Sequence, residues 1–178
     1  MPRVLITGGP GVGKTTLLAE LSAKGYKTVA ESARAIISER LARGQSPRPD
    51  PIAFAHEILR RDTEKYHAHP AESGWVFFDR GAVEALGMIH EVTPLSPAEL
   101  AAALQALRFH PAVFVLPPWK EIYATDVERD QSFPWVEHVH HQLVRWYRSC
   151  GYVVHEVPCA PVTARAEFVL RTLAHVDA

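Results

Sequence analysis

The chain has 178 residues, of which 47% are hydrophobic and 22% charged, so it can build an apolar core without help from disulfide bonds. Its formal net charge of −1 excludes a general binder of nucleic acids or membrane surfaces, because no basic excess is present to follow a phosphate-rich surface. The two cysteines are too few for a disulfide framework, and the apolar runs are too short to cross a bilayer. We therefore expect a single cytoplasmic domain over residues 1–178.

The first expected element is a buried strand over residues 4–7, which leads through a glycine-rich loop into a helix over residues 15–23. From Gly8 to Thr15 the loop has the spacing G-x-x-x-x-G-K-T of a phosphate-binding P-loop. Glycines let backbone N–H groups turn toward a polyphosphate, and the helix start adds free N–H groups and a positive dipole end. The nucleotide-binding residues expected from this motif are Gly8, Gly9, Pro10, Gly11, Val12, Gly13, Lys14, Thr15 and Thr16.

Two side chains of this motif have distinct expected roles. Lys14 is expected to contact the β- and γ-phosphates as a catalytic residue, and the Thr15 hydroxyl is expected to ligate Mg²⁺. ATP is the expected nucleotide, with GTP as the alternative, because the Asn-Lys-x-Asp pattern that reads guanine is missing from the sequence.

The second expected strand, over residues 27–30, delivers Glu31 and Arg34 to the same edge of the sheet. These residues lie three apart at the start of a helix, so they share one face and could hold the hydroxyl groups and phosphate of an acceptor. A plain surface ion pair is the alternative. After a proline-rich loop over residues 44–51, a charged helix is expected over residues 52–67, either as a solvated face or as a cover of the acceptor site.

The third expected strand, over residues 75–78, ends in Asp79 and Arg80. Beside a P-loop, Asp79 can hold Mg²⁺ through water or accept a proton from an attacking hydroxyl, so we expect it to be catalytic and metal-binding. Capping of the next helix is its alternative role. Arg80 is expected to bind a phosphate of the substrate, or else to pair with Glu31.

The remaining chain continues the alternation of helices and strands. Helices are expected over residues 82–90, 98–109, 135–150 and 162–174, and strands over residues 112–116 and 152–157. This alternation predicts an α/β fold with a parallel sheet covered by helices on both faces. Right-handed crossovers then place the carboxyl ends of all strands at one edge, where ligands bind.

The charged segment after the fourth expected strand is predicted to be a mobile lid over about residues 119–134. An arginine on a closing lid stabilises the charge that spreads over a transferred phosphoryl group, and Arg129 is our candidate for this catalytic role. A solvated loop is the alternative.

Four stretches together resemble a known family. They are GGPGVGKTT at 8–16, ESAR at 31–34, FFDRG at 77–81, and VFVLPPWKEIY at 113–123 with Asp126 and Arg129. The chain resembles small AAA-type predicted ATPases, which are grouped with the nicotinamide riboside kinase domain of bacterial NAD-biosynthesis regulators. The resemblance implies a P-loop kinase fold with five parallel strands in the order 2-3-1-4-5 and a lid after the fourth strand. It also implies that Asp79 is the second acidic anchor and that the loop near residues 158–162 lies by the nucleotide base.

The function expected from these residues is an ATP- and Mg²⁺-dependent phosphotransferase that acts on a small, hydroxyl-bearing, nucleoside-like metabolite. Its expected partners are a nucleoside triphosphate and this acceptor, with no general nucleic-acid binding and no membrane. Two alternatives stay open: a nucleotide-binding regulatory switch, and a simple NTPase in which Asp79 or Glu31 orients the attacking water.

Overall fold

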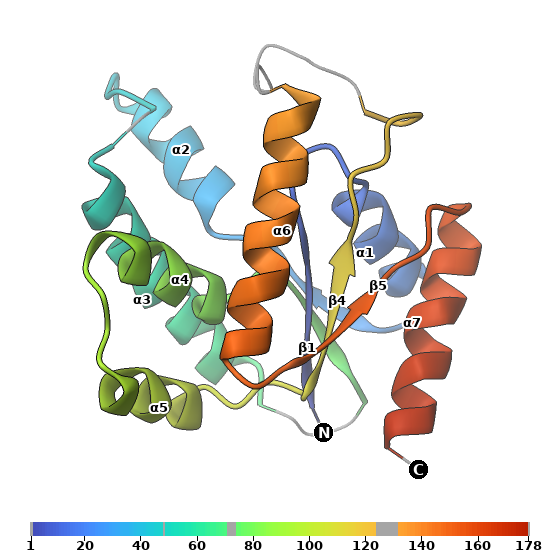
Figure 1. Ribbon diagram of the computed structural model, residues 1–178. Helices are drawn as coiled ribbons and strands as arrows, with labels where there is room; N and C mark the ends of the chain where they lie inside the picture. Colours follow the sequence, from blue (N-terminus) through green and yellow to red (C-terminus); the bar gives the residue numbers. More distant parts are fainter. Residues whose placement is uncertain (1, 48, 71–73, 124–131, 178) are drawn as a thin grey trace.

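The computed structural model describes residues 2–47, 49–70, 74–123 and 132–177 (Figure 1). Its centre is a five-stranded parallel sheet in the order β2-β3-β1-β4-β5. The strands are β1 (Arg3–Gly8), β2 (Lys27–Val29), β3 (Val76–Asp79), β4 (Ala112–Leu116) and β5 (Val153–Glu156). The predicted fold class is confirmed, including the strand order that the family resemblance implied.

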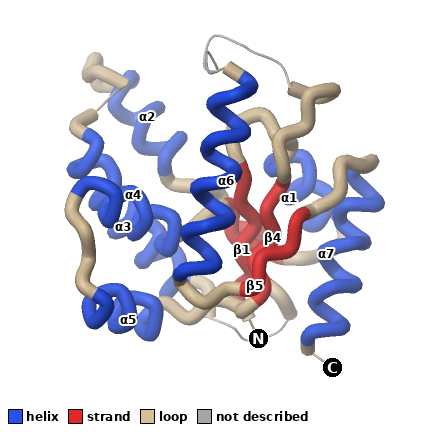
Figure 2. Tube along the Cα trace, viewed as in Figure 1, coloured by secondary structure: helices blue, strands red, loops and turns tan. Residues whose placement is uncertain are grey.

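Helices cover both faces of this sheet, as the tube in Figure 2 shows. Helices α1 and α7 pack against each other on one face, and α3, α4 and α6 lie on the other, where α4 contacts both of its neighbours. The helices are α1 (Lys14–Ala23), α2 (Ala33–Ala42), α3 (Pro51–Ala68), α4 (Ala82–Val92), α5 (Pro97–Ala106), α6 (Phe133–Ser149) and α7 (Val162–Val176). None of the helices in the described ranges is long and apolar enough to cross a membrane.

Strand β1 is buried on both faces, which explains its continuous apolar run. Val4 and Ile6 belong to the core cluster formed with α1 and α7, whereas Leu5 belongs to the cluster formed with α3, α4 and α6. The register pairs Ile6 with Asp79 on β3 and Gly8 with Leu116 on β4. The P-loop and Asp79 therefore meet at the carboxyl edge of the sheet.

Helix α5 is shorter than the sequence predicted. It begins with a capping box between Ser96 and Glu99, as a stable helix start does, but it ends at Ala106 rather than at residue 109. Phe109 leaves the helix and packs edge-on against Tyr66 and Phe78, with ring centroids 5.1 and 5.4 Å away. Burial of this aromatic ring outweighs the helix propensity of the preceding alanines.

Candidate active site

The P-loop has a backbone that requires glycine at specific positions. Gly8 has φ 145°, and a Cβ there would lie 2.6 Å from the carbonyl oxygen of Leu116. Gly13 caps α1 with φ 86°, and a Cβ there would lie 2.7 Å from Nη1 of Arg165. The motif glycines thus serve both a left-handed backbone and close packing against neighbouring segments.

Lys14 is a buried cation at the centre of the loop. Its Nζ donates hydrogen bonds to the carbonyl oxygens of Gly8 at 2.8 Å and Gly9 at 2.7 Å, and the residue is only 8% exposed. Burial lowers the pKa of Lys14 to about 7, the positive charge of Arg80 adds to this, and the carboxylate of Asp79 opposes it. A bound polyphosphate would place negative charge next to Lys14 and so favour the charged form of this lysine.

Asp79 and Thr15 are the two residues that were expected to hold a magnesium ion. The Oδ1 atom of Asp79 is buried and has no hydrogen-bond partner within the described ranges. Burial raises the pKa of Asp79 to about 6, although Lys14 acts in the opposite direction. Thr15 lies exposed in the first turn of α1. An unpaired carboxylate oxygen and a free hydroxyl at one sheet edge fit the hard-oxygen ligands of Mg²⁺.

Arg80 connects the carboxyl ends of three strands. Its backbone adopts φ 61°, a left-handed conformation unusual for a residue with a side chain. Its Nε donates to Glu31 at 3.0 Å, its Nη2 donates to the Gly8 carbonyl at 3.0 Å, and its Nη1 donates to Glu84. The pairing of Arg80 with Glu31 was one of the two predicted alternatives, and in this structure it is formed.

Glu84 is a site residue that the sequence reasoning missed. Besides the ion pair with Arg80, its Oε2 accepts hydrogen bonds from the Thr7 hydroxyl at 2.5 Å and from the Tyr147 hydroxyl at 3.4 Å. Glu84 therefore fixes Arg80 from the first turn of α4. Its position four residues after Arg80 was the only available signal.

Glu31 and Arg34, which follow β2, form the ion pair that was the alternative to acceptor binding. Nε of Arg34 lies 2.9 Å from Oε1 of Glu31, and the Arg34 side chain is 57% exposed whereas that of Glu31 is 16% exposed. Glu31 is thus shared between Arg34 at the surface and Arg80 inside.

Five of these site residues border a cavity of about 870 Å³: Lys14, Glu31, Arg34, Arg80 and Glu84. This size suits a small organic ligand, because ligand pockets in proteins usually enclose about 300–1,000 Å³. Charged groups from the carboxyl edge of the sheet line it together with apolar side chains of α2, α3 and α4. The lining residues are Pro10, Lys14, Glu31, Ser32, Ala33, Arg34, Ile37, Ser38, Leu41, Pro47, Phe54, Ile58, Asp62, Arg80, Gly81, Glu84, Ala85, Met88 and Trp135.

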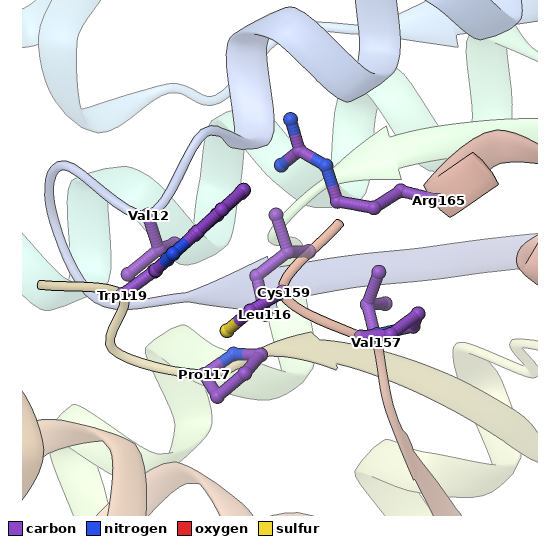
Figure 3. A pocket seen from close by; sticks show the side chains of 8 residues that line it. Val12, Leu116, Pro117, Trp119, Val157, Cys159 and Arg165 are labelled. Atoms are coloured by element: carbon purple, nitrogen blue, oxygen red, sulfur yellow. The ribbon is translucent and has the colours of Figure 1, made fainter. Parts of the chain in front are cut away.

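A second, smaller pocket adjoins the P-loop beside β4 and β5 (Figure 3). The Arg165 guanidinium extends from the first turn of α7 and lies 5.6 Å from the centre of the Trp119 ring. The pocket is also lined by Val12 of the P-loop and by Pro158 and Cys159, which follow β5. The family resemblance implied a base site near residues 158–162, and the first residues of that loop line this pocket.

Part of the expected lid can be placed. Residues 119–123 form a tight turn in which the N–H groups of Ile122 and Tyr123 donate to the Trp119 carbonyl at 3.3 and 3.1 Å. The Tyr123 ring packs against Phe133, with centroids 5.5 Å apart. The candidate Arg129 lies outside the described residues, as does Asp126.

A glycine-rich loop between the first strand and helix of a 2-3-1-4-5 parallel sheet defines the class of P-loop nucleotide-binding folds. Within this class the chain belongs to the AAA domain family, whose model matches residues 3–165. A comparison with curated protein sequences gives no match.

Solved structures share this fold at low sequence identity. Deoxyadenosine kinase from M. mycoides with products dCMP and a flexible dCDP bound is 15% identical, with a TM-score of 0.66 over 97% of this chain and 99% of that chain. The NadR protein in complex with NAD and AMP-PNP is 15% identical, with a TM-score of 0.65 over 99% of this chain but only 50% of that chain. NadR in complex with NR is 16% identical, with a TM-score of 0.60 over 98% of this chain and 51% of that chain.

Proposed function

We propose that the protein is a kinase that transfers the γ-phosphoryl group of ATP to a hydroxyl of a small, nucleoside-like metabolite. The observation that carries this proposal is the cavity of about 870 Å³ lined by Lys14, Glu31 and Arg80. The P-loop lysine, which would contact the transferred phosphoryl group, thus borders a space large enough for an organic acceptor. Hydrolysis alone would need room for only one water molecule.

In the proposed reaction, the acceptor oxygen forms a bond to the γ-phosphorus while the bond to the β–γ bridging oxygen breaks and ADP leaves. The backbone of residues 8–16 and the Lys14 ammonium would hold the phosphates. Glu31 or Asp79 would receive the hydroxyl proton. A magnesium ion held by Thr15 and Asp79 would neutralise charge on the β- and γ-phosphate oxygens. On sequence grounds alone, Arg129 is proposed to stabilise the transferred group.

The comparisons support a nucleoside-like acceptor and ATP as the donor. Proteins that share this fold include a deoxyadenosine kinase, and NadR in complex with NR or with AMP-PNP. The apolar part of the cavity, with Phe54, Ile58 and Met88, offers a surface for a flat ring.

The test is ADP release from the purified protein with Mg-ATP, alone and with a panel of nucleosides, nicotinamide riboside and other small alcohols. Lys14→Ala serves as the blank, and Lys24→Ala, a change at an exposed lysine just beyond α1, is the matched control. We expect at least one compound to raise the rate by about tenfold or more over the basal rate, because a positioned acceptor replaces a poorly held water. A rate that no compound changes would support the simple NTPase or the regulatory switch instead.

A further inference from the structure

Asp62 on α3 is a buried carboxylate that borders the acceptor cavity. The residue is only 5% exposed and is one of the residues that line the cavity. Its Oδ1 accepts a hydrogen bond from the Ser32 hydroxyl at 2.5 Å. Within the described ranges, Ser32 is its only hydrogen-bond partner and it forms no ion pair; the charge of Lys65 acts on it, but Nζ of Lys65 donates to the Ala30 carbonyl instead. The second oxygen, Oδ2, is therefore available to a molecule inside the cavity.

The packing of α2 against α3 does not explain why this position carries a charge. Arg61, the neighbour of Asp62 on α3, already joins the two helices through a bidentate ion pair with Glu39 on α2, at 2.7 and 2.8 Å. A hydrogen bond from Ser32 needs only a neutral oxygen acceptor. Burial of a carboxylate without a cation is costly, and burial indeed raises the pKa of Asp62.

The residues around Asp62 indicate what kind of ligand group would bind to its carboxylate. Ile58 and Phe54 of α3 and Met88 of α4 line the same cavity and present apolar surface. The charged groups Lys14 and Glu31, which would face the reacting hydroxyl, belong to the carboxyl edge of the sheet. The ring of an acceptor that fills the cavity would therefore lie among apolar side chains, beside the Oδ2 atom of Asp62, which has no donor within the described residues.

We propose that Asp62 is a specificity-determining residue whose Oδ2 accepts a hydrogen bond from an N–H group on the ring of the acceptor. This inference rests on the proposed function and narrows its substrate class to nucleoside-like compounds that carry such a donor. A buried polar group built to bind a donor rejects an analogue without it, because that analogue leaves the group unpaired.

Matched substrate pairs test this inference in the wild-type protein. The pairs are adenosine and purine riboside, cytidine and pyrimidin-2-one riboside, and nicotinamide riboside and nicotinic acid riboside. In each pair only the first member has the exocyclic N–H donor. For the class of ring that the protein phosphorylates, we expect kcat/KM for the first member to exceed that of the second by about 100-fold or more.

Asp62→Asn separates recognition from structure. The variant can still accept the Ser32 hydrogen bond through its amide oxygen, but it replaces Oδ2 with an NH₂ donor. We expect its preference within the pair to fall to about threefold or less, since the donor of the substrate then meets another donor. Asp50→Asn, the same change at the exposed cap of the same helix, keeps the cap and the wild-type preference.

Each outcome decides between the inference and its alternatives. Wild-type protein that phosphorylates both members of every pair equally would overturn the role of Asp62 and leave the kinase intact. Asp62→Asn protein with a lowered melting temperature and an unchanged preference would assign the residue a structural role only. If no compound accepts phosphate, the proposed kinase function fails and the inference fails with it.

Discussion

Binding of ATP should draw a proton onto Lys14, because the free protein holds this lysine in an environment that disfavours charge. Its pKa is lowered to about 7 by burial and by Arg80, and its Nζ donates to two backbone carbonyls, which a neutral amine can also do. At about pH 8 a group with this pKa is about 10% protonated. Contact with a triphosphate returns the pKa toward its usual value of about 10.4, so nearly every bound lysine becomes charged.

The expected uptake is therefore about 0.9 proton per ATP bound near pH 8. Isothermal titration calorimetry in buffers of different ionisation enthalpy measures it, with a chelator present to exclude magnesium. Lys24→Met, a change at an exposed lysine, should leave the uptake unchanged, whereas Lys14→Met should abolish it. Tight ATP binding with an uptake below about 0.2 proton near pH 8 would refute the reasoning, because Lys14 would then be charged before binding.

Three further substitutions test the site. Gly8→Ala should lower the free energy of unfolding by about 1–3 kcal/mol in urea and abolish ATP binding, because the added Cβ would clash with a backbone carbonyl. Gly25→Ala, also at positive φ but with open space around it, should keep ATP binding. Glu84→Gln should destabilise the protein by about 2–4 kcal/mol, because it removes one of the two carboxylates that pair with Arg80 and leaves only Glu31. Glu57→Gln at the surface should cost under about 1 kcal/mol. Asp79→Asn should abolish Mg-dependent turnover. The stability of this variant relative to wild type should rise by up to about 3 kcal/mol between about pH 4 and pH 7, because burial raises the pKa of Asp79 from its ordinary value of 3.8 to about 6, so that folding disfavours the ionised form. If the difference in stability between Asp79→Asn and wild type stayed constant across this pH range, the pKa of Asp79 would not be raised in the folded protein.

The sheet and the main site residues could be predicted because local rules decide them. An apolar run such as residues 4–7 indicates a strand buried on both faces, and a parallel sheet brings the carboxyl ends of such strands together. This rule is why Glu31, Asp79 and Lys14 were expected at one edge, and all three interact electrostatically in the structure.

The roles of Asp62 and Arg165 could not be predicted from the sequence. Arg165 makes contacts between segments that are distant in the chain, and the helical spacing of buried residues around Asp62 is hard to recognise among many charged residues. Asp62 lies on a buried stripe of α3 with Ala55, Ile58 and Tyr66, at spacings of three and four residues. Because this helix has many charged residues, the sequence did not distinguish a solvated face from a cover of the acceptor site. Nη1 of Arg165 lies 3.5 Å from the carbonyl oxygen of Gly13, which is 152 residues away in the chain. No local sequence pattern predicts such a contact.

In the proposed reaction the γ-phosphoryl group moves from ATP to an organic hydroxyl in the cavity between the P-loop and α3. The most direct test of this transfer follows the label of γ-³²P-ATP into products in the presence of the acceptor panel. We expect label in a phosphorylated metabolite, and we expect this label to be lost in Lys14→Ala and retained in Lys24→Ala. Label that appears only as inorganic phosphate, with every compound of the panel, would contradict the proposed transfer.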